Sequence, residues 1–138
     1  MPTLRLEIVT PEAKTFSDDV DLVTMPGLDG EMGILAGHMP LLTQIRPGEL
    51  RVTKGKEEFS IAVGDGFVEI TGEKISVLTD LAIRAEEIDE SKAEEARHRA
   101  EEALRGKLSA DQEAATRAML EKSLAQLNVK RRRRERHG

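Results

Sequence analysis

The sequence predicts an α+β fold, with an N-terminal antiparallel β-sandwich followed by a C-terminal antiparallel two-helix hairpin. Two observations carry this prediction. All five prolines precede residue 48, nine of the eleven glycines precede residue 73, and segments of alternating apolar and polar residues fill the same half. After residue 84 the composition turns to Ala, Glu, Arg and Leu. We therefore expect two domains, residues 1–84 and residues 85–138.

The strands are predicted from a period of two. Residues 3–10 place Leu4, Leu6 and Ile8 on one face, which is typical of a half-buried strand. The same alternation predicts a strand over 19–25, two strands over 49–63 around a turn at 54–56, and two strands over 64–80 with Gly72 at the bend. In the strand over 19–25, the residues expected to share a face are Val20, Leu22 and Thr24. The stretch rich in Gly and Pro from 30 to 50 is interpreted as loop.

The helices are predicted from alanines at helical spacing. The first helix has Ala93, Ala96, Ala100, Ala103 and Leu104 on one face and ends near Gly106. The second begins with a capping box, Ser109 and Gln112, and carries Ala114, Ala118 and Ala125 on its apolar side. A buried methylene contributes roughly 0.8 kcal/mol, so a stripe made mostly of alanine gains little from burial. We expect the hairpin to pack weakly on the sandwich and to be able to detach.

Composition excludes several classes of function. The chain has no cysteine, which removes disulfides, thiolate chemistry and cysteine-based zinc sites. It has no Trp or Tyr and only three Phe, which argues against a base-stacking platform. Because there is no run of eighteen apolar residues and no basic, apolar leader at the N-terminus, we expect neither a membrane span nor a secretory signal.

Candidate catalytic residues are few. His38 is the one histidine outside the helical run and the tail, but the sequence places no serine or carboxylate beside it. A small hydrolase using His38 is an alternative function, and a structural loop histidine is the simpler interpretation. Residues 27–33, GLDGEMG, lack the Lys-Ser/Thr of a phosphate-binding loop. We expect no metal site.

The last ten residues form a basic tail with six Lys or Arg and one Glu. Its positive charges are Lys130, Arg131, Arg132, Arg133, Arg134 and Arg136. Such a tail suits nucleic acid, anionic lipid or an acidic protein surface, and it could also be a solvated appendage. Because the remainder of the chain is acidic and would repel nucleic acid and lipid, the acidic protein surface is favoured. A nucleic-acid-binding module remains an alternative function.

Three blocks of sequence resemble a known family. GEMGILAGHMPLLTQIRPGELRV, AVGDGFVEI and ISVLTDLAIRAEEID occur in the order and spacing of the epsilon subunit of bacterial F-type ATP synthases. The resemblance implies a non-catalytic central-stalk subunit of the rotor, peripheral to the cytoplasmic face of the bacterial plasma membrane. In the family this subunit couples proton flow to ATP synthesis and restrains ATP hydrolysis through its C-terminal helices. The implied partners are the gamma subunit, the proteolipid ring and, transiently, the alpha and beta subunits, with no nucleic acid.

The resemblance also implies contact residues. The segment expected against the proteolipid ring consists of Gly27, Leu28, Asp29, Gly30, Glu31, Met32 and Gly33, and Glu31 is the side chain expected at that contact. The segment expected against gamma consists of His38, Met39, Pro40, Leu41 and Leu42. The tail residues Lys130, Arg131, Arg132, Arg133, Arg134 and Arg136 are expected to meet an acidic segment of beta when the hairpin is extended.

Some family members bind ATP where the first helix begins. The matching residues here are Ile88, Asp89, Lys92 and Ala93, with Arg99 about two helical turns further on. Lys92 stands where those members have Arg, and a lysine cannot make the paired hydrogen bonds of a guanidinium. We therefore expect ATP to be at most a weak regulatory ligand and assign no cofactor. In the alternative interpretation Asp89 simply caps the helix.

Overall fold

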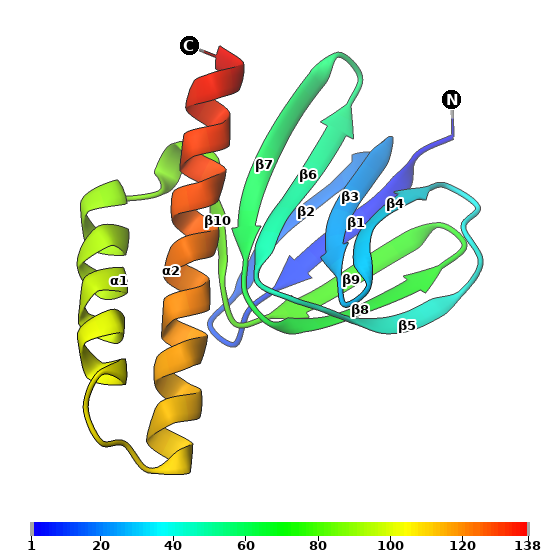
Figure 1. Ribbon diagram of the computed structural model, residues 1–138. Helices are drawn as coiled ribbons and strands as arrows, with labels where there is room; N and C mark the ends of the chain where they lie inside the picture. Colours follow the sequence, from blue (N-terminus) through cyan, green and yellow to red (C-terminus); the bar gives the residue numbers. More distant parts are fainter. Residues whose placement is uncertain (1, 138) are drawn as a thin grey trace.

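The computed structural model describes residues 2–137, with side chains to residue 135, and it confirms the predicted fold class (Figure 1). The strands are β1 Leu4–Val9, β2 Lys14–Val20, β3 Leu22–Gly27, β4 Gly30–Leu35, β5 Leu41–Ile45, β6 Gly48–Lys54, β7 Glu57–Val63, β8 Gly66–Thr71, β9 Lys74–Thr79 and β10 Ala82–Arg84. A 3₁₀ turn, η1 (Ala85–Glu87), leads into the helices α1 (Glu90–Leu104) and α2 (Ala110–His137).

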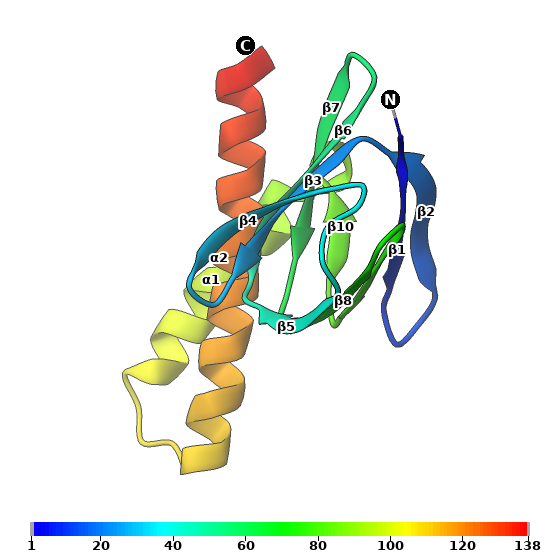
Figure 2. The same ribbon diagram turned by 90° about the vertical axis from the view of Figure 1, so that its right-hand side faces the viewer.

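The strands form one hydrogen-bonded sheet that folds over on itself. Their order is β10-β7-β6-β3-β5-β8-β9-β1-β2, and β4 pairs with the free side of β3. Among the described strands, the pairings are antiparallel apart from β1 with β9. β3 and β5 share only the pair Gly27–Ile45, so the sheet turns there from one layer into the other (Figure 2). The result is the expected sandwich.

The core lies between the two layers and is made of the inward residues of the alternating strands. Leu4, Leu6 and Ile8 of β1 are buried, as their spacing predicts. The buried cluster also contains Val20, Val23, Met25, Ile34, Ile45, Leu50, Val52, Ile61, Val63, Val68, Ile70, Ile75 and Val77. These large aliphatic side chains make the sandwich the main apolar core of the chain.

The prediction for residues 19–25 was wrong in phase. Val23 and Met25 are buried, whereas Leu22 and Thr24 are only half-buried. Asp21 separates β2 from β3. Its N–H donates to the Thr53 carbonyl at 2.8 Å, and its carboxylate accepts from the Gly55 N–H at 2.6 Å. Because Asp21 adds one residue between the two strands, the side chains that follow it alternate in the opposite phase and point to the other face.

The interpretation of residues 30–50 as loop was also wrong. This stretch contains β4, β5 and the start of β6. Gly27 pairs with Gly30 at the end of the β3–β4 hairpin, and Gly30 has a φ of 128°, which a side chain would strain. Gly27 and Gly30 therefore form a tight hairpin turn. β4 was missed because Ile34 is its only buried side chain, so the strand has no alternating apolar pattern in the sequence.

The two helices form the expected hairpin. Asp89 caps α1, because its carboxylate accepts from the Lys92 N–H at 3.1 Å. The capping box of α2 is present, with Ser109 Oγ accepting from the Gln112 N–H and Gln112 Oε1 accepting from the Ser109 N–H. The basic tail does not leave the helix, since α2 continues to His137. Its charges are therefore displayed at helical spacing along one rod.

α2 packs against the sandwich along β6 and β7, and α1 packs on the side of α2 that faces away from the sandwich (Figure 1). The buried apolar contact between the domains is a small cluster of Ala62, Ala85, Ile88 and Val129, with Ile83 packed beside it. Three of the alanines of the hairpin, Ala93, Ala100 and Ala125, are buried as well. The apolar area joining hairpin and sandwich is thus far smaller than the sandwich core, as the alanine stripe predicts.

Candidate interaction surfaces

The first candidate surface is the tip of the β3–β4 hairpin, residues 27–33. Leu28 is 46% exposed, and Asp29 and Glu31 are exposed beside it. Glu31 receives hydrogen bonds from the Arg51 guanidinium at 3.2 and 3.3 Å, which orients its carboxylate along the sheet. A Cβ at Gly27 would stand 2.9 Å from the Gly30 carbonyl oxygen, so the backbone turn is closely packed. The tip is therefore a rigid backbone loop carrying exposed groups, which is suited to recognition.

The second candidate surface is apolar. Met39 is 79% exposed and Leu42 is 70% exposed, within the segment predicted to meet gamma. Phe67 on β8 and Leu78 on β9 are 50% and 56% exposed and directly opposite each other in the sheet. Leu78 in turn pairs with Val9 of β1. We call Leu42, Phe67 and Leu78 the apolar strip.

Sequence reasoning missed two members of the apolar strip. The signal was available, because alternation in β8 puts Val68 and Ile70 inside and leaves Phe67 on the outer face. An apolar residue on an outward position of a strand indicates a contact surface when it has apolar neighbours. Those neighbours come from β5 and β9, and their pairing with β8 could not be read from the sequence.

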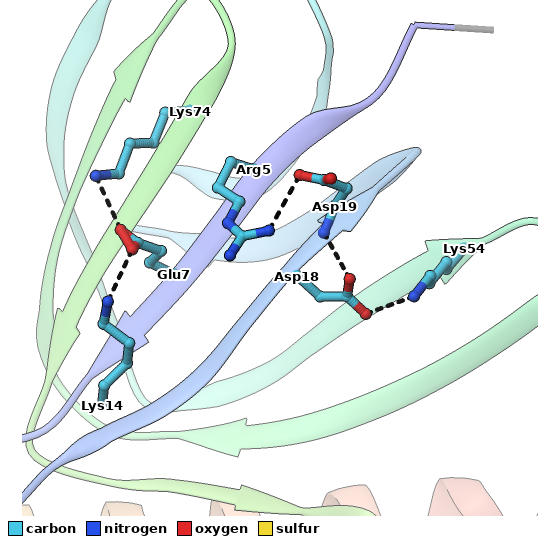
Figure 3. Close-up of polar contacts among 7 residues, drawn as sticks. All are labelled: Arg5, Glu7, Lys14, Asp18, Asp19, Lys54 and Lys74. Atoms are coloured by element: carbon cyan, nitrogen blue, oxygen red, sulfur yellow. Dashed lines mark hydrogen bonds and ion pairs between the residues drawn. The ribbon is translucent and has the colours of Figure 1, made fainter.

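Near β1 and β2, away from the apolar strip, the sandwich carries charged side chains that are paired with one another (Figure 3). Lys74 and Lys14 both reach the Glu7 carboxylate, at 2.8 and 3.1 Å, and these hydrogen bonds lower the pKa of Glu7. At the edge between the two layers, Asp18 of β2 is in register with the buried Leu6, and Lys54 of β6 bonds to it at 2.5 Å and lowers the pKa of that carboxyl in the same way. Because Glu7, Lys14 and Lys74 are already paired with one another, we take the apolar strip as the contact area of this face.

His38 lies in the loop between β4 and β5, where Gly37 bonds to Gly72 of the β8–β9 turn, and it is not placed for catalysis. Its Nδ1 is 2.7 Å from the Met39 carbonyl oxygen, a local bond that shapes the loop before β5. Among the described residues, no hydrogen bond or ion pair joins His38 to a serine or a carboxylate, and no group of His, Asp and Glu suited to a metal ion occurs. The remaining residues of this predicted segment, Pro40 and Leu41, are exposed on the way into β5.

The residues predicted to hold ATP divide into two groups. Ile88 and Ala93 are buried in the packing of the hairpin, 4% and 3% exposed. Asp89, Lys92 and Arg99 are exposed. The capping bond of Asp89 is the role that its alternative interpretation assigned to it.

The third candidate surface is the basic end of α2, and much of it is bound to the chain itself. Arg132 reaches Glu49 of β6 at 3.0 Å, and Arg134 makes a forked contact with Glu90 of α1 at 2.6 and 2.8 Å. The Lys130 ammonium donates to the Ala85 carbonyl oxygen at 3.2 Å.

The remaining tail residues have fewer contacts with the sandwich. Arg131 lies 4.0 Å from Glu135, one turn along the same helix, and Arg133 is half-buried. The side chain of Arg136 lies outside the described residues. Where α2 meets the β3–β4 tip and the start of β6, a groove of about 730 Å³ separates them, lined among others by Glu31, Glu49 and Arg132.

Comparison with known proteins decides the family. Residues 3–85 match the beta-sandwich domain of the ATP synthase delta/epsilon chain, and residues 86–131 match its long alpha-helix domain. The chain belongs to the ATP synthase delta/epsilon chain family. The resemblance described from the three sequence blocks is thereby confirmed, as is the expectation that the chain is an epsilon-type subunit of ATP synthase.

Relatives and solved structures agree with this family. The ATP synthase epsilon chain of Dehalococcoides mccartyi is 44% identical over 136 residues, which covers 98% of this chain and 97% of that one. The epsilon chain of Herpetosiphon aurantiacus is 41% identical over 133 residues, covering 96% and 98%. A chain in the Euglena gracilis mitochondrial ATP synthase, solved as OSCP/F1/c-ring, aligns with a TM-score of 0.73 at 25% identity, covering 88% of this chain and 77% of that chain.

Among the residues that the structure describes, no helix is both long enough and apolar enough to cross a membrane. The chain's likeness to a subunit of a rotor complex supports association with the rotor of ATP synthase.

Proposed function

We propose that the chain is a non-catalytic subunit of the central stalk, which couples proton flow to ATP synthesis and restrains ATP hydrolysis through its helical hairpin. The observation that carries this is the match of both domains to the delta/epsilon family, in a molecule with a large sandwich core and a small hairpin contact. A rigid sandwich suits permanent attachment to a rotor. A lightly attached hairpin suits a movable regulator.

The tip of the β3–β4 hairpin is the surface that we propose for the proteolipid ring. It comprises residues 27–33, and its exposed groups are Leu28, Asp29 and Glu31. The tight backbone presents them on a rigid support, so that torque can pass through the contact without deforming it.

The apolar strip, together with residues 38–42, is the surface that we propose for gamma. Exposed apolar side chains on three neighbouring strands are the expected centre of a protein interface, and ion-paired charges border them. The chain would then be held at the membrane by its partners, peripheral to the cytoplasmic face of the bacterial plasma membrane.

The basic end of α2 is the surface that we propose for transient contact with the catalytic beta subunit, and through the same hairpin with alpha. Six positive charges on one helical rod gain from an acidic segment in a partly desolvated cleft, where paired charges interact more strongly than in water. ATP would act on the hairpin as a weak regulatory ligand at Ile88, Asp89, Lys92, Ala93 and Arg99. Family membership gives no support to the alternative functions, a hydrolase using His38 or a nucleic-acid-binding module.

The decisive experiment is reconstitution with separately purified gamma and proteolipid ring. We expect the wild-type chain to be retained by both, and Phe67→Asp to lose gamma while keeping its thermal unfolding transition, since Phe67 is half exposed. Met119→Asp is the matched control, because Met119 is 49% exposed on α2 and away from the strip. Equal retention of Phe67→Asp and wild type by gamma would refute the assignment of this surface.

A further inference from the structure

The closest polar contact between the hairpin and a buried group of the sandwich is the pair Arg132–Glu49. Glu49 lies on β6, and its side chain is 2% exposed. Its Oε1 accepts from Arg132 Nη1 at 3.0 Å, and its Oε2 accepts from the Ser60 hydroxyl of β7 at 2.7 Å. A carboxylate buried to this degree is costly unless it is paired and hydrogen-bonded.

The burial of Glu49 depends on the hairpin. Glu49 stands on the strand that α2 packs against, and it lines the same groove as Val129 and Arg132. When α2 leaves, the Glu49 carboxylate becomes accessible to water and loses its arginine. When α2 returns without Arg132, the same carboxylate is covered again and keeps its hydrogen bond from Ser60, but one partner of a buried ion pair has been removed, which is unfavourable.

We infer that Arg132 and Glu49 form a latch that holds the helical hairpin against the sandwich. The inference deepens the proposed function and rests on it for its biological meaning, because a latch regulates only a hairpin that detaches. It also divides the tail into two roles. Arg132 favours the docked hairpin, whereas Arg131, whose ion pair is with Glu135 of the same helix, is available to an acidic partner of the extended hairpin.

A second ion pair between α2 and the sandwich provides a comparison. Lys122 reaches Asp80 at 2.7 Å, but the two side chains are 31% and 41% exposed. Exposed pairs contribute about 0–1 kcal/mol, because water screens both charges in either state. The buried carboxylate is what makes Arg132–Glu49 selective for the docked arrangement.

The latch can be tested on the isolated full-length chain. The sequence has no cysteine, so Lys56→Cys on the β6–β7 turn and Ala115→Cys on α2, both exposed positions, allow donor and acceptor dyes to be attached at defined places. Energy transfer between the dyes then reports the ratio of docked to detached hairpin along a urea titration.

We expect Arg132→Ala to lower the docked-to-detached ratio about tenfold, which corresponds to about 1.4 kcal/mol. Arg131→Ala is the matched control, because it removes the same charge one residue away and is expected to leave the ratio unchanged. In a chain that already carries Glu49→Ala, Arg132→Ala should have no further effect. Arg132→Lys should give an intermediate ratio, since lysine keeps the positive charge but replaces the guanidinium that donates to Glu49 with a more strongly hydrated ammonium.

Equal ratios for Arg132→Ala and Arg131→Ala would overturn the latch, as would an undiminished effect of Arg132→Ala in the Glu49→Ala background. No partner subunit is present, so this outcome is independent of the rotor assignment, which the gamma and ring retention experiment tests. In the assembled complex, Arg132→Ala should inhibit ATP hydrolysis more than Arg131→Ala does. Both variants lose one positive charge that could contact the beta subunit, but only Arg132→Ala also loses the latch.

Discussion

The apolar part of the hairpin contact is small enough for one side chain to control it. Val129 is completely buried and packs with Ala62, Ala85 and Ile88 at the junction of α2, β7 and η1. Val129→Ala removes two methyl-sized groups. At roughly 0.8 kcal/mol each, with a small additional term for the cavity, the change should cost about 2 kcal/mol of docking free energy.

That cost falls on docking and not on the sandwich. A change of 2 kcal/mol lowers the docked-to-detached ratio roughly 30-fold, since 1.4 kcal/mol is tenfold. The sandwich core shares no residue with the small cluster, so its unfolding should be unaffected. Helix propensity does not offset the loss, because α2 is helical in both states under the proposed mechanism.

Methyl NMR signals of Ala62 and Ile88 provide the assay, because both groups are buried only when the hairpin is docked. We expect their shifts in Val129→Ala to move toward those of a chain truncated after residue 88, while the shifts of core residues such as Ile34 stay in place. Met119→Ala, at a half-exposed position of the same helix, is the control. Unmoved signals in Val129→Ala, or loss of the core signals with them, would refute the separation of the two apolar contacts.

Four further predictions address other parts of the molecule. Glu31→Lys should weaken retention by the proteolipid ring, measured in reconstituted vesicles, without changing the unfolding temperature. Glu7→Gln should lower the free energy of unfolding at neutral pH and match wild type in acid. The lowered pKa of Glu7 means that its contribution to stability is present above the usual pKa of about 4.3 and is lost as the pH falls through the pKa of the folded state. Urea titrations at several pH values measure this difference. Gly66→Ala should destabilise the sandwich by about 1–3 kcal/mol in thermal unfolding, since its Cβ would collide with the Leu78 carbonyl oxygen, whereas Gly72→Ala, with open space around it, should not. Lys92→Arg should tighten ATP binding, measured by calorimetric titration; equal weak heats from both chains would remove ATP from the mechanism.

The parts of the fold that could be predicted are those with a strong local pattern. β1 follows from strict alternation of Leu4, Leu6 and Ile8, and both helices follow from alanine spacing and their caps. β4 and β5 could not be predicted in this way. Most of their residues face solvent or pack against half-buried neighbours, so their strand conformation depends on pairing with β3 and β8, which are distant in sequence or lie across a glycine turn.

The candidate surfaces were predictable in part for the same reason. The β3–β4 tip is continuous in sequence, so a resemblance over residues 27–33 locates it whole. The apolar strip is assembled from three strands, and Phe67 and Leu78 join Leu42 only through the register of β5, β8 and β9. The Arg132–Glu49 pair spans 83 residues, and local sequence patterns carry no information about such a contact.

The contrast between the two apolar clusters connects stability to function. Aliphatic side chains fill the sandwich, so its free energy of unfolding is spread over many contacts, and single exposed changes on the β3–β4 tip or the apolar strip leave it folded. The hairpin is attached through four small or medium side chains and a few charges, so its docking free energy is concentrated at a few positions. A subunit that transmits torque needs the first property where it contacts its partners. A subunit that restrains hydrolysis reversibly needs the second, because a docking energy of a few kcal/mol is what the binding of one partner or ligand can overcome. An alanine-rich hairpin with a half-exposed arginine on a buried carboxylate meets this requirement, and filling its interface with leucine would abolish it.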